Sequence, residues 1–205
     1  MHPDDPKDPG HLGTPTPLML ASQYGHADIV QLLLEGGADK DFRNENDYTP
    51  LMLAAEEGHV HVTRLLLESG ASKDARELDG WTPLMLAAGE GSAQVAQLLL
   101  EAGARTELRR RDGSTALMSA ALNSQAAVVR LLLQAGAHMD ARDNGGNTAL
   151  MEAMHAAPAA IDGHVEVVRV LLDAGAAKDV RNELGKTALM MATDPEIRRL
   201  LGAGF

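Results

Sequence analysis

The sequence contains no cysteine, and this absence excludes several kinds of chemistry. Without thiols the chain cannot form disulfides, use a thiolate nucleophile or hold zinc through sulfur. It also lacks any run approaching the roughly 18 consecutive apolar residues of a membrane-spanning helix. We therefore expect no membrane span and an intracellular location, in the cytoplasm or alternatively the nucleus.

Positive charge is also scarce, because 18 Lys and Arg face 29 Asp and Glu and leave a formal net charge of -11. Nucleic acids and anionic membranes attract proteins through clustered positive charge. The charge balance argues against both as the main partner.

Aromatic residues make up only 2% of the chain, whereas hydrophobic residues make up 45%. The apolar share is mostly Leu, Ala, Met and Val, of which the first three are strong helix formers. This composition predicts an all-α core. Residues 1–13 are acidic and rich in proline, so we expect a disordered segment there rather than a secretory signal. We expect a single domain over residues 14–205.

Two short motifs recur in phase along the chain. A Thr-Pro-Leu-Met or Thr-Ala-Leu-Met segment repeats at intervals of 33, 33, 33, 33 and 39 residues, starting at Thr16, Thr49, Thr82, Thr115, Thr148 and Thr187. A leucine-rich triplet follows each of the first five, beginning at Leu32, Leu65, Leu98, Leu131 and Val170. Regular self-similarity of this length predicts an array of about six repeated helix pairs.

The residues around each motif supply helix boundaries. The threonine can cap a helix, and proline at the next position has its φ already set for the first turn. A glycine then ends each first helix in most repeats, at Gly25, Gly58, Gly91 and Gly163, with Ser124 in the fourth. The second helix, for example Val62 to Glu68, places Val62, Leu65 and Leu66 on one face. One pair is too small to bury its own apolar face, so neighbouring pairs must cover one another.

This pattern resembles the ankyrin repeat family, whose signature is Thr-Pro-Leu-His-x-Ala with a 33-residue period. The resemblance covers about Thr14 to Leu201 and implies a solenoid of helix-turn-helix units with short β-hairpin fingers. It also implies that fingers and first helices form a concave face that binds a protein.

The chain departs from that family pattern in three places. Methionine replaces the family's histidine in every repeat. The fifth repeat carries a six-residue insertion near residues 154–162, where Pro158 should stop or kink the first helix. The last repeat, residues 187–205, is shortened to a cap in which Asp194 starts a new helix. The fold should tolerate the replacement of histidine by methionine.

Few residues stand out as candidates for contact with a partner. Aromatic side chains at a binding face are candidate anchors, and glutamates at the ends of first helices would form an acidic rim. These candidates are Tyr24, Tyr48, Trp81, Glu56, Glu57 and Glu90. An alternative left open is that Tyr48 and Trp81 merely pack across adjacent fingers.

A basic run in the fourth finger, Arg109 to Arg111, gives two more candidates. Arg110 and Arg111 could receive a carboxylate or phosphate of the partner, although a solvated charge run is the simpler interpretation. Arg109 belongs to a periodic set, each member two residues after an acidic residue: Arg43, Arg76, Arg109, Arg142 and Arg181. We interpret this set as a ladder of ion pairs between fingers.

No constellation predicts catalysis, a metal site or a cofactor. His59 and His61 lie near Glu56 and Glu57, but His26, His59 and His164 recur after a glycine and are interpreted as structural. The sequence therefore predicts a non-enzymatic adaptor or scaffold, as a monomer or a subunit of a larger complex. Two alternatives remain, an assembly chaperone or inhibitor that masks a partner and a non-catalytic subunit of an enzyme complex.

Overall fold

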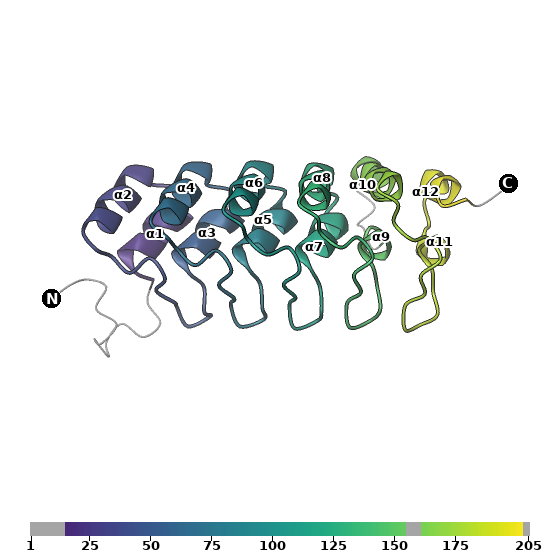
Figure 1. The fold of residues 1–205 in the computed structure, drawn as a ribbon, viewed down its shortest axis with the longest axis horizontal. Helices are drawn as coiled ribbons and strands as arrows, with labels where there is room; N and C mark the ends of the chain where they lie inside the picture. Colours follow the sequence, from purple (N-terminus) through teal and green to yellow (C-terminus); the bar gives the residue numbers. More distant parts are fainter. Residues whose placement is uncertain (1–14, 155–160, 203–205) are drawn as a thin grey trace. The chain divides into compact units, whose positions relative to one another are not determined.

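A computed structural model describes residues 15–154 and 161–202 of this chain (Figure 1). Within these residues the secondary structure is entirely helical, as predicted. The helices in chain order are α1 (Pro17–Gln23), α2 (Ala27–Glu35), α3 (Pro50–Glu56), α4 (Val60–Glu68), α5 (Pro83–Glu90), α6 (Ala93–Glu101), α7 (Ala116–Leu122), α8 (Ala126–Gln134), α9 (Ala149–Glu152), α10 (Ile161–Asp173), α11 (Ala188–Met191) and α12 (Pro195–Leu200). The predicted disorder of residues 1–13 and the effect of Pro158 lie outside the described residues.

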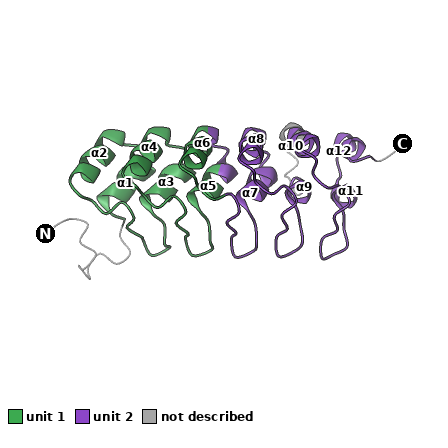
Figure 2. Cartoon of the chain, viewed as in Figure 1, with its two compact units in different colours: residues 1–87, 94–105 green, residues 88–93, 106–205 purple. Residues whose placement is uncertain are grey.

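The chain divides into two compact units (Figure 2). Unit 1 comprises residues 1–87 and 94–105, and unit 2 comprises residues 88–93 and 106–205. In unit 1, α1 packs beside α3 and α2 beside α4, and each first helix contacts its own second helix (Figure 1). In unit 2 the same arrangement joins α7, α9 and α11 in one layer and α8, α10 and α12 in the other. Whether residues 14–205 behave as a single domain remains a prediction.

Threonine starts the first helix of most repeats, as the motif predicts. In five repeats its hydroxyl accepts a hydrogen bond from the backbone N–H of the methionine three residues on, at 3.3–3.4 Å. Such a cap satisfies one of the N–H groups that the first turn leaves without a helical partner. In the fifth repeat Thr148 has no side-chain cap bond, and its helix α9 is only four residues long.

The first helices end mostly where glycine was expected, with one error. Gly25, Gly58 and Gly91 adopt a positive φ of 72–75°. Ser124 adopts φ 61° at the same place, although a side chain disfavours this conformation. Its hydroxyl lies 2.6 Å from Nε2 of His164. Gly163, in contrast, does not end a first helix but lies inside α10, because the insertion separates it from α9.

The second helices bury one stripe of side chains. The helix predicted from Val62 begins two residues earlier, at Val60, and its buried residues are Val62, Thr63 and Leu66. Leu65 is only partly buried, so the buried face of this helix is rotated slightly from the predicted one. The central leucine of the triplet is fully buried in four repeats, at Leu66, Leu99, Leu132 and Leu171. Burial of each such side chain is worth about 1.5–3 kcal/mol.

The loops between repeats project from the helical layers as fingers (Figure 1). The predicted β-hairpins are not present as strands in residues 15–154 and 161–202. Each finger is instead a tight turn closed by a backbone hydrogen bond, such as Glu77 N–H to the Trp81 carbonyl at 3.1 Å. The arms are too short to form the paired ladder that defines a sheet.

Methionine at the family's histidine position packs into the core. Met19, Met52, Met85, Met118 and Met151 are 0–2% exposed, while Met190 in the last repeat is 60% exposed. The unbranched thioether fills these positions without needing a polar partner. The final helix α12 starts as predicted, because the Asp194 carboxylate accepts from the backbone N–H of Glu196 and Ile197. No helix of the described residues is long and apolar enough to cross a membrane.

Candidate functional site

Tyr48 and Trp81 occupy equivalent positions, 33 residues apart, in successive fingers of unit 1. Both are half-buried and pack against one apolar cluster made of Met52, Ala75 and Leu86. The packing interpretation is therefore correct for the inner faces of these rings. Because neither ring is fully buried, an aromatic surface also remains open to solvent.

The same turn chemistry fixes the backbone beneath each ring. The Asn44 side-chain oxygen accepts from the backbone N–H of Tyr48 at 3.0 Å. Four residues before Trp81, the Glu77 carboxylate accepts from the Trp81 N–H at 2.8 Å. The two fingers are joined by a hydrogen bond of 3.4 Å from the Leu78 N–H to the Asn46 carbonyl. These bonds hold the two aromatic residues in a fixed register.

Negative charge surrounds the phenol of Tyr48. The pKa of Tyr48 is raised from 10.0 to about 12. Burial is the largest cause, and the negative charges of Glu56, Glu77 and Asp79 contribute the rest. A phenolate would be disfavoured both by the low polarity beside Met52 and by these like charges. The Tyr48 hydroxyl is thus held as a neutral donor beside acidic groups. We call Tyr48, Trp81, Glu56, Glu77 and Asp79 the finger patch.

This environment predicts a late ionisation of Tyr48. In a Tyr24→Phe background, where Tyr48 is the sole tyrosine, tyrosinate absorbance should appear with a midpoint near pH 12. After denaturation the same group should titrate near 10.0. Since the folded pKa is the higher one, the stabilisation is complete below pH 10 and is lost as pH rises towards 12. Equal midpoints in the folded and denatured protein would contradict this environment.

The structure places two other candidates of unit 1 at the C-terminal ends of first helices. Tyr24 is the C-terminal cap of α1, is 64% exposed and lies with its ring 6.3 Å from that of His26. Glu57 is the equivalent cap of α3 and is exposed. Tyr24 therefore corresponds by repeat position to Glu57, and not to Tyr48 or Trp81.

The remaining three candidates belong to unit 2. Glu90 is the last residue of α5 and is exposed. Arg110 lies in the finger turn and forms an ion pair with Asp112 at 3.2 Å. Arg111 is exposed, and its carbonyl accepts a hydrogen bond from the Asn144 amide at 2.9 Å. The role of all three in binding remains a prediction.

The periodic arginines donate to backbone carbonyls of the next finger, and Arg43 also forms an ion pair with Asp47 of its own finger at 3.9 Å. Arg43 donates to the carbonyl of Arg76 at 2.8 Å, and Arg142 donates to the carbonyl of Arg181 at 2.8 Å. For four of the five arginines, the acidic residue two positions earlier accepts from a backbone N–H of the next repeat, as Asp41 does from Ser72 at 2.7 Å. The fingers are thus tied by side-chain-to-backbone hydrogen bonds, because the carbonyls lie within reach and the carboxylates are already occupied.

Two of the three periodic histidines, His59 and His164, contact the preceding repeat, as a structural role predicts, whereas His26 is exposed. Nε2 of His59 lies 2.8 Å from the carbonyl of Gln23 and so joins the end of α1 to the start of α4. His164 is buried beside Ser124, and burial lowers its pKa below the usual 6.5. Within the described residues, no group of three or more His, Asp or Glu side chains could hold a metal ion.

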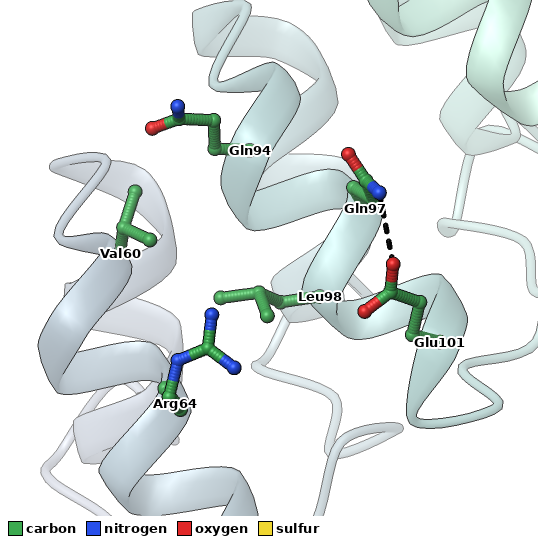
Figure 3. Close-up of a pocket in the computed structure, with 6 residues that line it drawn as sticks. All are labelled: Val60, Arg64, Gln94, Gln97, Leu98 and Glu101. Carbon is green, nitrogen blue, oxygen red and sulfur yellow. Dashed lines mark hydrogen bonds between the residues drawn. The ribbon is translucent and has the colours of Figure 1, made fainter.

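A shallow groove lies between α4 and α6 of unit 1 (Figure 3). It is lined by Val60, Arg64, Gln94, Gln97, Leu98 and Glu101. The Gln97 amide donates to Glu101 at 2.8 Å, and the Arg64 side chain points from α4 toward Leu98 of α6. The groove holds no nucleophile with an adjacent base, so it does not suggest a reaction.

Sequence reasoning identified the two aromatic residues but missed most of their surroundings. Glu77 and Asp79 complete the acidic part of the finger patch, and Met52 and Leu86 support the rings. Glu77 could have been found, because it precedes Trp81 by four residues as Asn44 precedes Tyr48. The support of two fingers by one cluster depends on side-chain packing and has no comparable signal in the sequence.

Comparison with known families gives a clear result. A family model of ankyrin repeats in three copies matches residues 18–110, 73–143 and 105–157. A single-repeat ankyrin model matches residues 145–183. These matches together span most of the chain. No curated protein showed a significant match to the sequence.

Proposed function

Since this chain belongs to the ankyrin repeat family, we propose that it is an adaptor or scaffold that recognises a protein through the finger patch. Ankyrin repeats are generally protein-protein interaction modules, and they are typically non-catalytic. A protein partner follows from family membership. The adaptor role and the finger patch as the contact surface are the proposal.

One observation supports the finger patch as the contact surface. Tyr48 and Trp81 pack on a common apolar support, with their backbones fixed by Asn44 and Glu77. Large aromatic side chains that are already ordered lose little conformational entropy when a partner covers them. No other pair of large aromatic residues is packed on one cluster in the part of the chain that the structure describes.

The charge around the rings indicates the chemistry of the partner. Glu56, Glu77 and Asp79 all act electrostatically on Tyr48. A partner segment with an apolar side chain beside a lysine or arginine would cover the rings and neutralise these carboxylates. Complementary charge of this kind chiefly sets specificity and association rate. A Tyr48 phenol that stays neutral can also donate a hydrogen bond to that partner.

Trp81 allows a direct test, because it is the only tryptophan in the chain. Partners would be captured from native extract with the intact protein, and each purified candidate would be titrated against it while Trp81 emission is followed. We expect an emission change that saturates with partner concentration. We expect Tyr48→Ala, followed by Trp81 emission, to weaken binding by roughly tenfold or more, the usual effect of an aromatic anchor. Titration calorimetry should show a similar or larger loss for Trp81→Ala and for the Tyr48→Ala, Trp81→Ala double variant.

A matched control comes from the same finger position in unit 2. Ser114 is the equivalent of Tyr48 and Trp81, and Ser114→Ala should leave affinity unchanged. Helical circular dichroism of each variant would show that folding is retained. A partner that binds the double variant as tightly as the intact chain would refute the finger patch as the contact surface. It would leave Tyr24, Glu57, Glu90, Arg110 and Arg111 to be tested in turn.

A further inference from the structure

The two end repeats expose apolar side chains at positions that inner repeats bury. Ile29 in α2 is 49% exposed, while the equivalent valines are 0–1% exposed, namely Val62, Val95, Val128 and Val167. Met190 in α11 is 60% exposed, while its five equivalents are 0–2% exposed. Leu32, beside Ile29 on α2, is 67% exposed.

Repeat position indicates which kind of neighbour each of these two exposed surfaces would fit. Met19 in the first repeat is fully buried, so a following repeat is sufficient to cover this position. Ile197 in the last repeat is 5% exposed, so a preceding repeat is sufficient to cover the valine position. The exposed Ile29 thus marks a surface suited to a preceding repeat. The exposed Met190 marks a surface suited to a following repeat.

Charged residues follow the same rule on the second helices. Arg130 of α8 forms an ion pair with Glu166 of α10. One repeat further on, Arg169 of α10 pairs with Glu196 of α12 at 3.0 Å. In both pairs an arginine of one repeat reaches the carboxylate of the next.

One residue in the first repeat and one in the last align by repeat register with the members of these ion pairs. Arg199 of α12 aligns with Arg169, and Asp28 of α2 aligns with Glu166. Both are exposed, and within residues 15–154 and 161–202 neither takes part in an ion pair. The first repeat therefore presents the acidic side chain of Asp28, and the last repeat presents the basic side chain of Arg199. Inner repeats need not use the pair, since Arg64 of α4 faces a groove that also holds Gln94 at the acidic position (Figure 3).

We propose that the last repeat of one copy docks on the first repeat of a second copy. Met190 would cover Leu20 of α1, which is 42% exposed and corresponds to Leu86, the neighbour of Met52. The end of α12 would cover Ile29 and Leu32, and Arg199 would pair with Asp28. This contact has the same apolar and ionic components as the repeat-to-repeat contacts within the chain. The two surfaces differ, so the association is head-to-tail and adds copies in a line unless a ring closes. The inference does not depend on the proposed function of the finger patch.

Charge reversal at the two ends tests this contact with the full chain. The average mass in solution, measured by light scattering, should rise above that of one copy as concentration increases. Asp28→Arg and Arg199→Asp should each weaken association by roughly tenfold or more, because like charges then meet. Mixing the two variants should restore association, since every contact between unlike copies again joins opposite charges. The double variant should associate like the unchanged chain.

An inner position supplies the control. Arg64→Asp changes the same kind of residue at the equivalent place in α4 and should leave association unchanged. A second variant, Met190→Glu, should weaken association without affecting folding, because Met190 is already exposed. The proposal is overturned if the protein has the mass of one copy at all concentrations. It is equally overturned if the single variants associate normally or if their mixture behaves like either one alone.

Discussion

Leu132→Ala should lower the free energy of unfolding by about 3–5 kcal/mol, the usual cost of removing a fully buried leucine. Leu132 is the central leucine of its triplet and has no solvent exposure. It lies in α8, whose second-layer neighbour in unit 2 is α10. Truncation therefore removes contacts within one repeat and with the next, and leaves a cavity that neither helix can fill without moving.

Denaturant unfolding followed by helical circular dichroism would measure this loss. Leu32→Ala is the matched control, because Leu32 begins the equivalent triplet of α2 but is 67% exposed. Its effect should be at most about 0.5 kcal/mol, as for other surface substitutions. Measurements belong at low protein concentration, where the proposed self-association is absent. Similar losses for the two variants would mean that the triplets do not pack as described.

Gly113→Ala should destabilise unit 2 by about 2–5 kcal/mol, since it combines an unfavourable backbone conformation with a steric clash. Gly113 has φ 83° in the fourth finger. A Cβ there would lie 2.7 Å from the backbone nitrogen of Asn144 and 2.6 Å from its side-chain oxygen. The nitrogen belongs to the next finger and cannot rotate away. Its N–H also donates to the Asp112 carbonyl at 2.9 Å, so separating the fingers would break that bond.

Gly136→Ala separates the two contributions. Gly136 has φ 85°, but a Cβ there would meet no atom within 4 Å. Only the conformational cost remains, about 1–2 kcal/mol. Thermal or denaturant unfolding of both variants would compare them directly. If Gly113→Ala were no more destabilising than Gly136→Ala, the close approach of the two fingers would be incorrect.

Several features were predictable because they depend on short stretches of chain. The Thr caps, the glycines that end most first helices and the cap at Asp194 each follow from residues within one turn of the helix boundary. Gly163 was misassigned because the insertion separates it from α9, so a motif read by repeat position pointed to the wrong helix.

The candidate site was predictable only in part. Trp81 and Tyr48 stood out because aromatic residues are rare in this chain and these two share one repeat position. Tyr24 stood out for its rarity as well, but its repeat position is that of Glu57, at the other end of the first helix. The arginine set was detected correctly by period, yet its partners in the next finger are carbonyls, and the carboxylate that Arg43 meets belongs to Asp47 of its own finger. Period identifies equivalent residues but does not identify the atoms that they meet.

By itself the sequence determined the repeat, most helix boundaries and the family, because a 33-residue period and local capping chemistry are properties of residue order. Tertiary structure alone decided which side chains each repeat shares with the next. It placed Tyr48 and Trp81 on one support and surrounded Tyr48 with three carboxylates. It also left Ile29 and Met190 exposed where their equivalents are buried. Burial and pairing depend on atoms brought together from distant parts of the chain, and those distances exist only once the repeats have stacked.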